Sequence, residues 1–116
     1  MTTSSAQQRH REYIDSPVWK RRRARYLASH YPKCAACGTS YGIEVHHRTY
    51  DNAFQGQELD ADLVAVCRDH HQRAHDLFDT GAYASLDAAT RAMLAEAGGS
   101  LQDAPVVVRL LRKFFR

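Results

Sequence analysis

The hydrophobic positions in the first third of the chain predict one amphipathic helix. Trp19 and Tyr26 recur with the spacing of a single helix face. Ser16-Pro17 precedes them, and a serine cap followed by proline in the first helical position is a common helix start. We expect this helix to end at Tyr31-Pro32, and we expect the small polar residues of 1–12 to form a flexible tail.

Two short apolar runs in the middle of the chain predict a pair of strands. Ile43–His47 has the character of an extended segment, and Leu63–Cys67 is either a second strand or the approach to the following turn. The stretch 51–60 between them shows no clear periodicity, so we predict a loop there.

Three helices are predicted after this pair. Residues 70–79 form one that a glycine closes, and residues 86–97 form another that Ser85 caps and Gly98 stops. The last predicted helix covers 105–116, although its three consecutive valines leave a strand open as the alternative.

Composition and length fit one such domain. The chain has 116 residues, of which 44% are hydrophobic and 25% charged, and this allows one modest core. We predict an α+β fold, mostly helical, for a single domain over 13–116, with its core over 34–79 and a helical extension over 82–116. No apolar run is long enough for a secretory signal or a membrane span, so we expect an intracellular, cytoplasmic protein.

Charge is spread unevenly along the chain. The formal net charge is +3, yet residues 9–33 hold eight Lys or Arg against two acids, and residues 58–79 hold six acids against two arginines. Residues 106–116 hold four basic residues and no acid. Basic ends around an acidic middle favour a polyanion that is bound through its backbone, although solvated helix faces explain the pattern equally well.

Cysteine spacing predicts a structural zinc site. Cys34 and Cys37 form one C-x2-C pair, and Cys67 and His70 form a second pair with the same spacing after 29 intervening residues. Zinc prefers four sulfur or nitrogen ligands in a tetrahedron, and two tight turns supply them at little cost in chain entropy. The alternative is a buried Cys67 beside a redox pair, but no βαβ pattern surrounds the C-x2-C pair. Four protein ligands leave no open position, so this zinc would stabilise the fold.

Histidines cluster in the same region. Five of the seven fall within one 30-residue stretch. His71 and His75 lie four residues apart on a predicted helix, so both imidazoles project from one face and can share an ion, whereas His70 points about 100° away. His46 and His47 are neighbours on a predicted strand, so both reach one site only if the strand twists or turns there; otherwise one of them takes part alone.

These motifs resemble the HNH endonuclease family, whose core is a ββα-metal finger. The resemblance covers residues 13–75, more than half of the chain. It rests on CAACG at 34–38, IEVHHRTY at 43–50 and DLVAVCRDHHQRAH at 62–75, together with the lead-in YIDSPVWK at 13–20. Two positions depart from the family pattern. His70 stands where the fourth zinc ligand is usually cysteine, and Asp62 stands where the residue that gives the family its middle letter is usually asparagine.

The resemblance implies a metal-dependent endonuclease that hydrolyses phosphodiester bonds of DNA. It makes His47 the general base, His46 and His71 the ligands of a divalent ion that stabilises the departing oxygen, and His75 a further ligand or phosphate contact. Asp62 would brace the loop that orients the base, since aspartate accepts the same hydrogen bonds as asparagine but donates none. The structural zinc ligands implied by the family are Cys34, Cys37 and Cys67, with His70 in the fourth position. Imidazole and phosphate ligands accept Mg²⁺, Mn²⁺, Ni²⁺ or Zn²⁺, and we expect Mg²⁺ because it is abundant.

We assign DNA binding, expected to be to the double strand, to basic side chains that contact phosphates and so confer affinity without sequence specificity. These are Lys20, Arg21, Arg22, Arg23, Arg25 and Arg48. The basic C-terminal segment is a second DNA contact, a partner-docking helix or a cover for the core. Two other classes stay open, a catalytically silent zinc-stapled DNA-binding module and a zinc-stapled adaptor for another protein. The sequence does not decide between a monomer, a homodimer and a complex with a protein partner.

Overall fold

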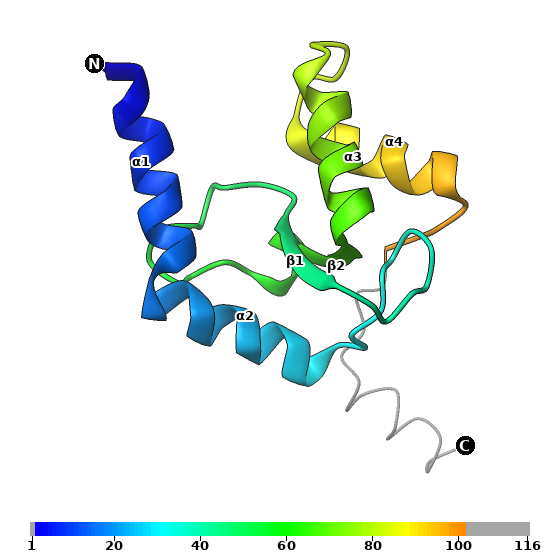
Figure 1. Ribbon diagram of the computed structural model, residues 1–116, viewed down its shortest axis with the longest axis horizontal. Coiled ribbons are helices and arrows are strands. Elements are labelled where there is room, and N and C mark those ends of the chain that lie inside the picture. The colour runs from blue at the N-terminus through cyan, green and yellow to red at the C-terminus, as the bar shows by residue number, and fades with distance from the viewer. Residues whose placement is uncertain (1, 102–116) are drawn as a thin grey trace.

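The computed structural model describes residues 2–101, with side chains from residue 5 onward. The elements follow in the order α1 (Thr2–Asp15), α2 (Pro17–Ser29), β1 (Ile43–His47), the short 3-10 helix η1 (Asp60–Asp62), β2 (Leu63–Cys67), α3 (Arg68–Asp79) and α4 (Leu86–Ala97). The expectation of a mostly helical α+β fold is confirmed. β1, β2 and α3 stand in ββα order (Figure 1). The helix predicted over 105–116 lies outside the described residues.

The Ser16-Pro17 junction separates α1 from α2. Ser16 is extended, with φ −77° and ψ 152°, because a following proline disfavours the helical conformation. Its hydroxyl accepts a hydrogen bond from the Trp19 amide, as predicted for a helix cap. The serine amide in turn donates to the Tyr13 carbonyl. One dipeptide thus starts α2 and also ends a helix that the sequence analysis did not predict.

Where a tail is expected over 1–12, the described residues are helical and belong to α1. This helix packs through aromatic and polar contacts to the loop before η1. The Arg9 guanidinium lies 5.3 Å from the centre of the Phe54 ring, and His10 Nε2 lies 3.2 Å from the Tyr50 hydroxyl. Tyr13 is buried. These partners are some 40 residues away, so a local hydropathy pattern does not reveal them.

β1 and β2 form an antiparallel hairpin in which His46 lies opposite Val64 and His47 opposite Leu63. Opposed residues project from the same face of a sheet, and neighbours along a strand project from opposite faces. In Figure 1 the hairpin lies between α1 and α2 on one side and α3 and α4 on the other. His46 and His47 therefore point toward different pairs of helices.

Two apolar clusters fill the two sides of the hairpin. The first joins the hairpin to α1 and α2 through Tyr13, Trp19, Tyr26, Val45, Leu63 and Ala65. The second joins it to α3, α4 and the cysteine turn through Cys34, Ala36, Val64, Val66, Cys67, Ala74, Met93 and Leu94. Alternation along β2 explains the division from Leu63 to Val66, because Leu63 and Ala65 fall in the first cluster and Val64 and Val66 in the second.

The segment after α4 returns to the cysteine turn. Gly98 ends the helix in the left-handed conformation, with φ 77°, as predicted. A Cβ on Gly99 would come within 2.1 Å of the Ala35 carbonyl oxygen, so only glycine fits there. The Ser100 amide donates to the same carbonyl. α4 is in this way joined to the part of the chain that carries Cys34 and Cys37.

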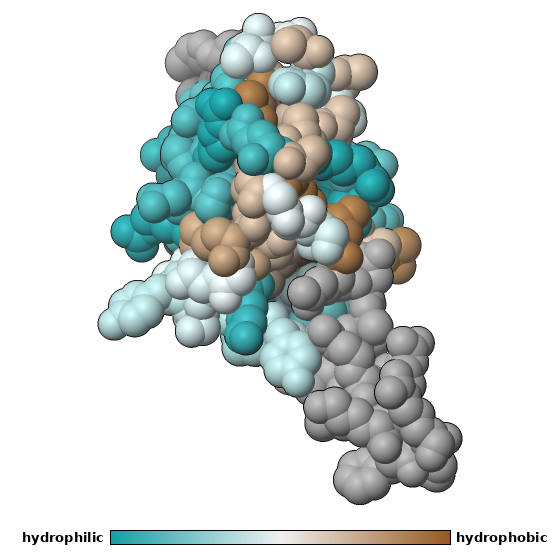
Figure 2. All heavy atoms as spheres, turned by 90° about the vertical axis from the view of Figure 1, so that its right-hand side faces the viewer, coloured by the Kyte–Doolittle hydropathy of each residue, from teal (hydrophilic) through white to brown (hydrophobic). Residues whose placement is uncertain are grey.

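On the surface, the side of the molecule shown in Figure 2 gathers hydrophobic residues in a central band between hydrophilic flanks. Within residues 2–101, no helix has the length and apolar character needed to cross a membrane.

Candidate active site

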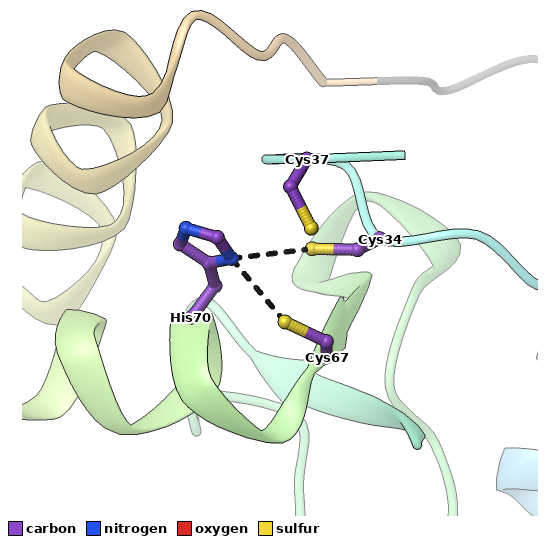
Figure 3. A group of neighbouring side chains, drawn as sticks. All are labelled: Cys34, Cys37, Cys67 and His70. Carbon is purple, nitrogen blue, oxygen red and sulfur yellow. Dashed lines mark hydrogen bonds between the residues drawn. The ribbon is translucent and has the colours of Figure 1, made fainter. Parts of the chain in front are cut away.

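The two cysteine and histidine pairs come together at one point, as their spacing predicts. His70 Nδ1 lies 3.2 Å from Cys67 Sγ and 3.8 Å from Cys34 Sγ, and Cys37 completes the group (Figure 3). One donor atom from each of the four residues lies within 4.8 Å of the others. Ligands about 2.3 Å from a tetrahedral ion are about 3.8 Å apart, so three sulfurs and one nitrogen at this spacing are compatible with a zinc site.

Local backbone structure positions these ligands. The Gly38 amide donates to the Cys34 carbonyl, and Gly38 adopts φ 78°, which closes the tight turn after Cys37. Cys67 is the last residue of β2 and the cap of α3, so His70 falls in the first turn of that helix. The Ala35 amide donates to the Ala65 carbonyl and fixes the turn against β2.

A second group consists of His46, His71 and His75. Their ring centres lie 4.8 to 5.2 Å apart, and one nitrogen from each lies within 4.8 Å of the others. His71 and His75 come from one face of α3, as predicted, and His46 comes from β1 across from them. His70 belongs to the other group, so α3 contributes to both, as its helical spacing predicts.

Thr90 on α4 determines which nitrogen of His46 is free. The Thr90 hydroxyl donates its proton to the Leu86 carbonyl at 2.8 Å, so it can only accept from His46 Nε2, also at 2.8 Å. Nε2 therefore carries the proton, and Nδ1 has no hydrogen-bond partner among the described residues although it is buried. Burial and the neighbouring histidines lower the pKa of His46 to about 2, which keeps this ring neutral. A bare, buried nitrogen in a histidine cluster fits a metal ion.

Glu44 has the same effect on His71. Its Oε1 lies 2.8 Å from His71 Nδ1, and a carboxylate only accepts, so Nδ1 carries the proton and Nε2 is left for a metal. Glu44 lies two residues before His46 on β1 and hence on the same face. Burial, followed by the influence of His71, lowers the pKa of His75. The three rings are thus suited to hold a divalent ion of the kind that imidazole prefers.

His47 lies on the other face of the hairpin, among aromatic rings. Its ring centre is 4.5 Å from that of Trp19, and it stacks on Tyr50 with a centre distance of 4.8 Å. Its Nε2 lies 2.7 Å from Oε2 of Glu58, a buried carboxylate in the preceding loop. Burial lowers the pKa of His47, and the hydrogen bond to Glu58 opposes this shift only in part. A neutral imidazole results.

A cavity of about 500 Å³ connects the two sides. It is lined by His47 from one side and by His71 and His75 from the other, with two arginines, Arg23 and Arg68. β1 is an edge strand of the two-stranded sheet, so residues on both of its faces reach the same opening. The cavity therefore brings a neutral imidazole, two members of the histidine cluster and two cations to one space.

Asp62 braces the loop that carries Glu58. Its Oδ2 accepts from the Asn52 amide at 3.0 Å and from the Leu59 backbone amide at 2.9 Å, while its carbonyl accepts from the Arg48 amide. The resemblance implied a bracing function at this position. Asn52, which sequence spacing did not place there, supplies the amide donor that an aspartate lacks.

Two of the six basic residues assigned to DNA are internal. Arg22, 5% exposed, donates to the Glu58 carbonyl and pairs with Asp60. Arg48, 8% exposed, pairs with Asp87 and donates to the Ala61 carbonyl. The assignment of these two to phosphates is therefore wrong. Arg22 lies three residues after Trp19 and four before Tyr26, so helical spacing already placed it on the buried face. Of the others, Lys20, Arg21 and Arg25 are exposed and Arg23 lines the cavity.

Comparison with protein-family models, with curated proteins and with solved structures finds no match to this chain. Any function must therefore be argued from the site. Several residues that contact these histidines were not predicted from the sequence. Strand alternation points to Glu44, but Tyr13, Glu58 and Thr90 lie far from their partners in sequence and have no local pattern.

Proposed function

We propose that the protein is a metal-dependent endonuclease of the HNH type that hydrolyses phosphodiester bonds of DNA. The observation that carries the proposal is one cavity lined both by the neutral imidazole of His47 and by His71 and His75, which form the histidine cluster together with the buried His46. Hydrolysis of a phosphodiester needs a group that removes a proton from water and groups that neutralise charge on the phosphate. Both kinds are present, in the order along the chain that the family pattern implies.

The residues divide the chemistry between them. His47 is neutral near pH 7 and takes the proton from the attacking water. Arg23 and Arg68 bind the non-bridging phosphate oxygens at the cavity wall. A divalent ion held by His46, His71 and His75 would supply positive charge at the scissile phosphate and the departing oxygen. Lys20, Arg21 and Arg25 on α2 contact flanking phosphates.

The ligand sets favour particular metals. Among residues 2–101 the histidine cluster includes no carboxylate, and three imidazoles favour Ni²⁺ or Zn²⁺ over the Mg²⁺ expected from abundance. We assign zinc to the group Cys34, Cys37, Cys67 and His70, where it ties the cysteine turn to β2 and α3 and contributes to folding.

A nicking assay with supercoiled plasmid tests the proposal. Protein loaded with one zinc per chain is incubated without further metal and with Mn²⁺, Ni²⁺ or Mg²⁺, beside His47→Gln and His30→Gln. His30 is the matched control, because it is also buried but hydrogen-bonds the Tyr26 carbonyl away from the cavity.

We expect metal-dependent nicking that His47→Gln reduces by about 10²- to 10⁴-fold, the usual contribution of a general base. The His30→Gln protein retains nicking, and equal zinc content shows that each variant is folded. If no ion supports nicking but the protein shifts DNA in a gel, the enzyme proposal fails and a DNA-binding module replaces it. If His47→Gln nicks like the wild type, His47 is not the base.

A further inference from the structure

Glu58 contacts His47, the proposed general base, but has no role in the reaction as described so far. Its side chain is 0% exposed. Its Oε2 accepts a hydrogen bond from the Tyr13 hydroxyl at 2.6 Å and lies 2.7 Å from His47 Nε2. Its Oε1 is buried and has no hydrogen-bond partner in the part of the chain that the structure describes.

A network that spans three elements holds this carboxylate in place. The Arg22 side chain donates to the Glu58 backbone carbonyl at 2.9 Å, and the Gly56 amide donates to the Tyr13 hydroxyl at 3.1 Å. Asp62 fixes the next residue, Leu59, through its backbone amide. Glu58 is therefore oriented by α1, α2 and η1 together, so its position does not depend on His47.

The hydrogen bonds determine the tautomer of His47. Burial raises the pKa of Tyr13, so its hydroxyl keeps its proton and donates it to Glu58. The same carboxylate oxygen faces His47 Nε2, and a carboxylate only accepts, so Nε2 must donate as well. In a neutral ring the lone pair is then on Nδ1. The stacked ring of Tyr50 and the ring of Trp19, which is tilted by 34°, hold the plane of the imidazole.

A purely structural link between α1 and the loop does not explain this arrangement. Such a link needs one acceptor for Tyr13, and an amide or hydroxyl would provide it without a buried charge. A buried carboxylate oxygen without a partner is costly to stability, and such groups concentrate where function retains them.

We propose that Glu58 is the positioning residue for His47, supported by Tyr13. It holds the imidazole as the Nε2–H tautomer and leaves Nδ1 to act on water. The proton passes from water to Nδ1 while the hydroxide oxygen bonds to phosphorus and the bond to the departing oxygen breaks. The imidazolium that forms is paired with the carboxylate, which keeps its own charge. This inference rests on the proposed function for its chemistry, but the tautomer itself can be measured in the absence of any activity.

The test combines ¹⁵N NMR of the histidine rings with steady-state nicking kinetics. The variants are Glu58→Met, Glu58→Gln and Tyr13→Phe, all zinc-loaded, and Glu12→Met is the control. Glu12 is an exposed carboxylate next to Tyr13 in sequence and hydrogen-bonds only Gln8 among the contacts described. Glu58→Gln keeps an acceptor oxygen for both donors, so it preserves the fold if Glu58→Met does not.

We expect His47 to be the Nε2–H tautomer in the wild type, in Glu12→Met and in Glu58→Gln, and to lose this preference in Glu58→Met. The value of kcat falls about 100-fold in Glu58→Met and about 10-fold in Glu58→Gln, with KM within about threefold, because a base acts in the transition state. An Nδ1–H tautomer in the wild type overturns the inference, as does an unchanged kcat in both Glu58 variants. A wild type without nicking activity refutes the proposed function. The tautomer of the His47 ring still shows in that case whether Glu58 positions it.

Discussion

Replacing Thr90 with valine should weaken metal binding at the histidine cluster, although Thr90 is not itself a ligand. The substitution preserves shape and removes the hydroxyl that accepts from His46 Nε2. His46 is 0% exposed, and its Nδ1 has no protein partner within the described residues. In Thr90→Val either tautomer therefore leaves one N–H buried without an acceptor.

The magnitude follows from this loss. A buried unsatisfied donor costs about 1–3 kcal/mol in the free energy of unfolding, and 1 kcal/mol lowers Tm by about 4–8 °C in a domain of about 100 residues. Loss of a group that orients a metal-binding histidine weakens metal affinity by about 10- to 100-fold, which is about 1.4–2.7 kcal/mol.

Isothermal titration of Ni²⁺ into the zinc-loaded protein measures the effect, and thermal unfolding measures the stability. Thr80→Val is the matched control, since the Thr80 hydroxyl also donates to a helix carbonyl, that of Leu77, but contacts no histidine. Thr90→Ser restores the hydroxyl and should recover most of the affinity. Wild-type Ni²⁺ affinity in Thr90→Val, or an equal loss in Thr80→Val, would refute the reasoning.

Three further outcomes are expected. Removal of zinc from the group Cys34, Cys37, Cys67 and His70 by a chelator, or the substitution Cys67→Ser, should abolish cooperative thermal unfolding, because this group joins three segments. Circular dichroism measures the unfolding, and an unchanged Tm would contradict the prediction. Below about pH 6.5 the unfolded chain binds a proton at His46 that the folded chain, with its pKa of about 2, does not. As the pH decreases, the free energy of unfolding in urea should therefore fall more steeply for the wild type than for His46→Leu, by about 1.4 kcal/mol per pH unit. Equal slopes in the two proteins would show that His46 is protonated alike in both states. Replacing Arg21 and Arg25 with alanine should reduce the slope of log K for DNA binding against log salt concentration by about 2. Arg22→Ala should lower the stability of the fold instead. If only Arg22→Ala changes the slope, Arg22 and not Arg21 or Arg25 contacts the phosphates.

Local features of the chain were predictable because they depend on a few neighbouring residues. Ser16-Pro17 caps α2, and Gly98 ends α4, as their backbone preferences require. That the two pairs Cys34–Cys37 and Cys67–His70 meet at one point was predicted from spacing alone, since each pair sits in a single turn.

The predictions that failed concern contacts between distant segments. The polar sequence of α1 gave no indication that Tyr13 would be buried against the loop that holds Glu58. The run of arginines on α2 looks uniform, yet Arg22 turns inward to that loop while Arg21 and Arg25 stay exposed.

The histidines show which features the sequence determines and which depend on tertiary structure. Sequence by itself determined that His71 and His75 share a helix face, because this follows from the helical period. For His46 and His47 it left two alternatives, a twisted strand that brings both to one site or one histidine that takes part alone. Only the tertiary structure decided that His46 joins the α3 histidines and that His47 meets Glu58. A hydrogen-bond partner for a buried ring depends on which segments pack beside it, and Thr90 and Glu58 reach their histidines from 44 and 11 residues away.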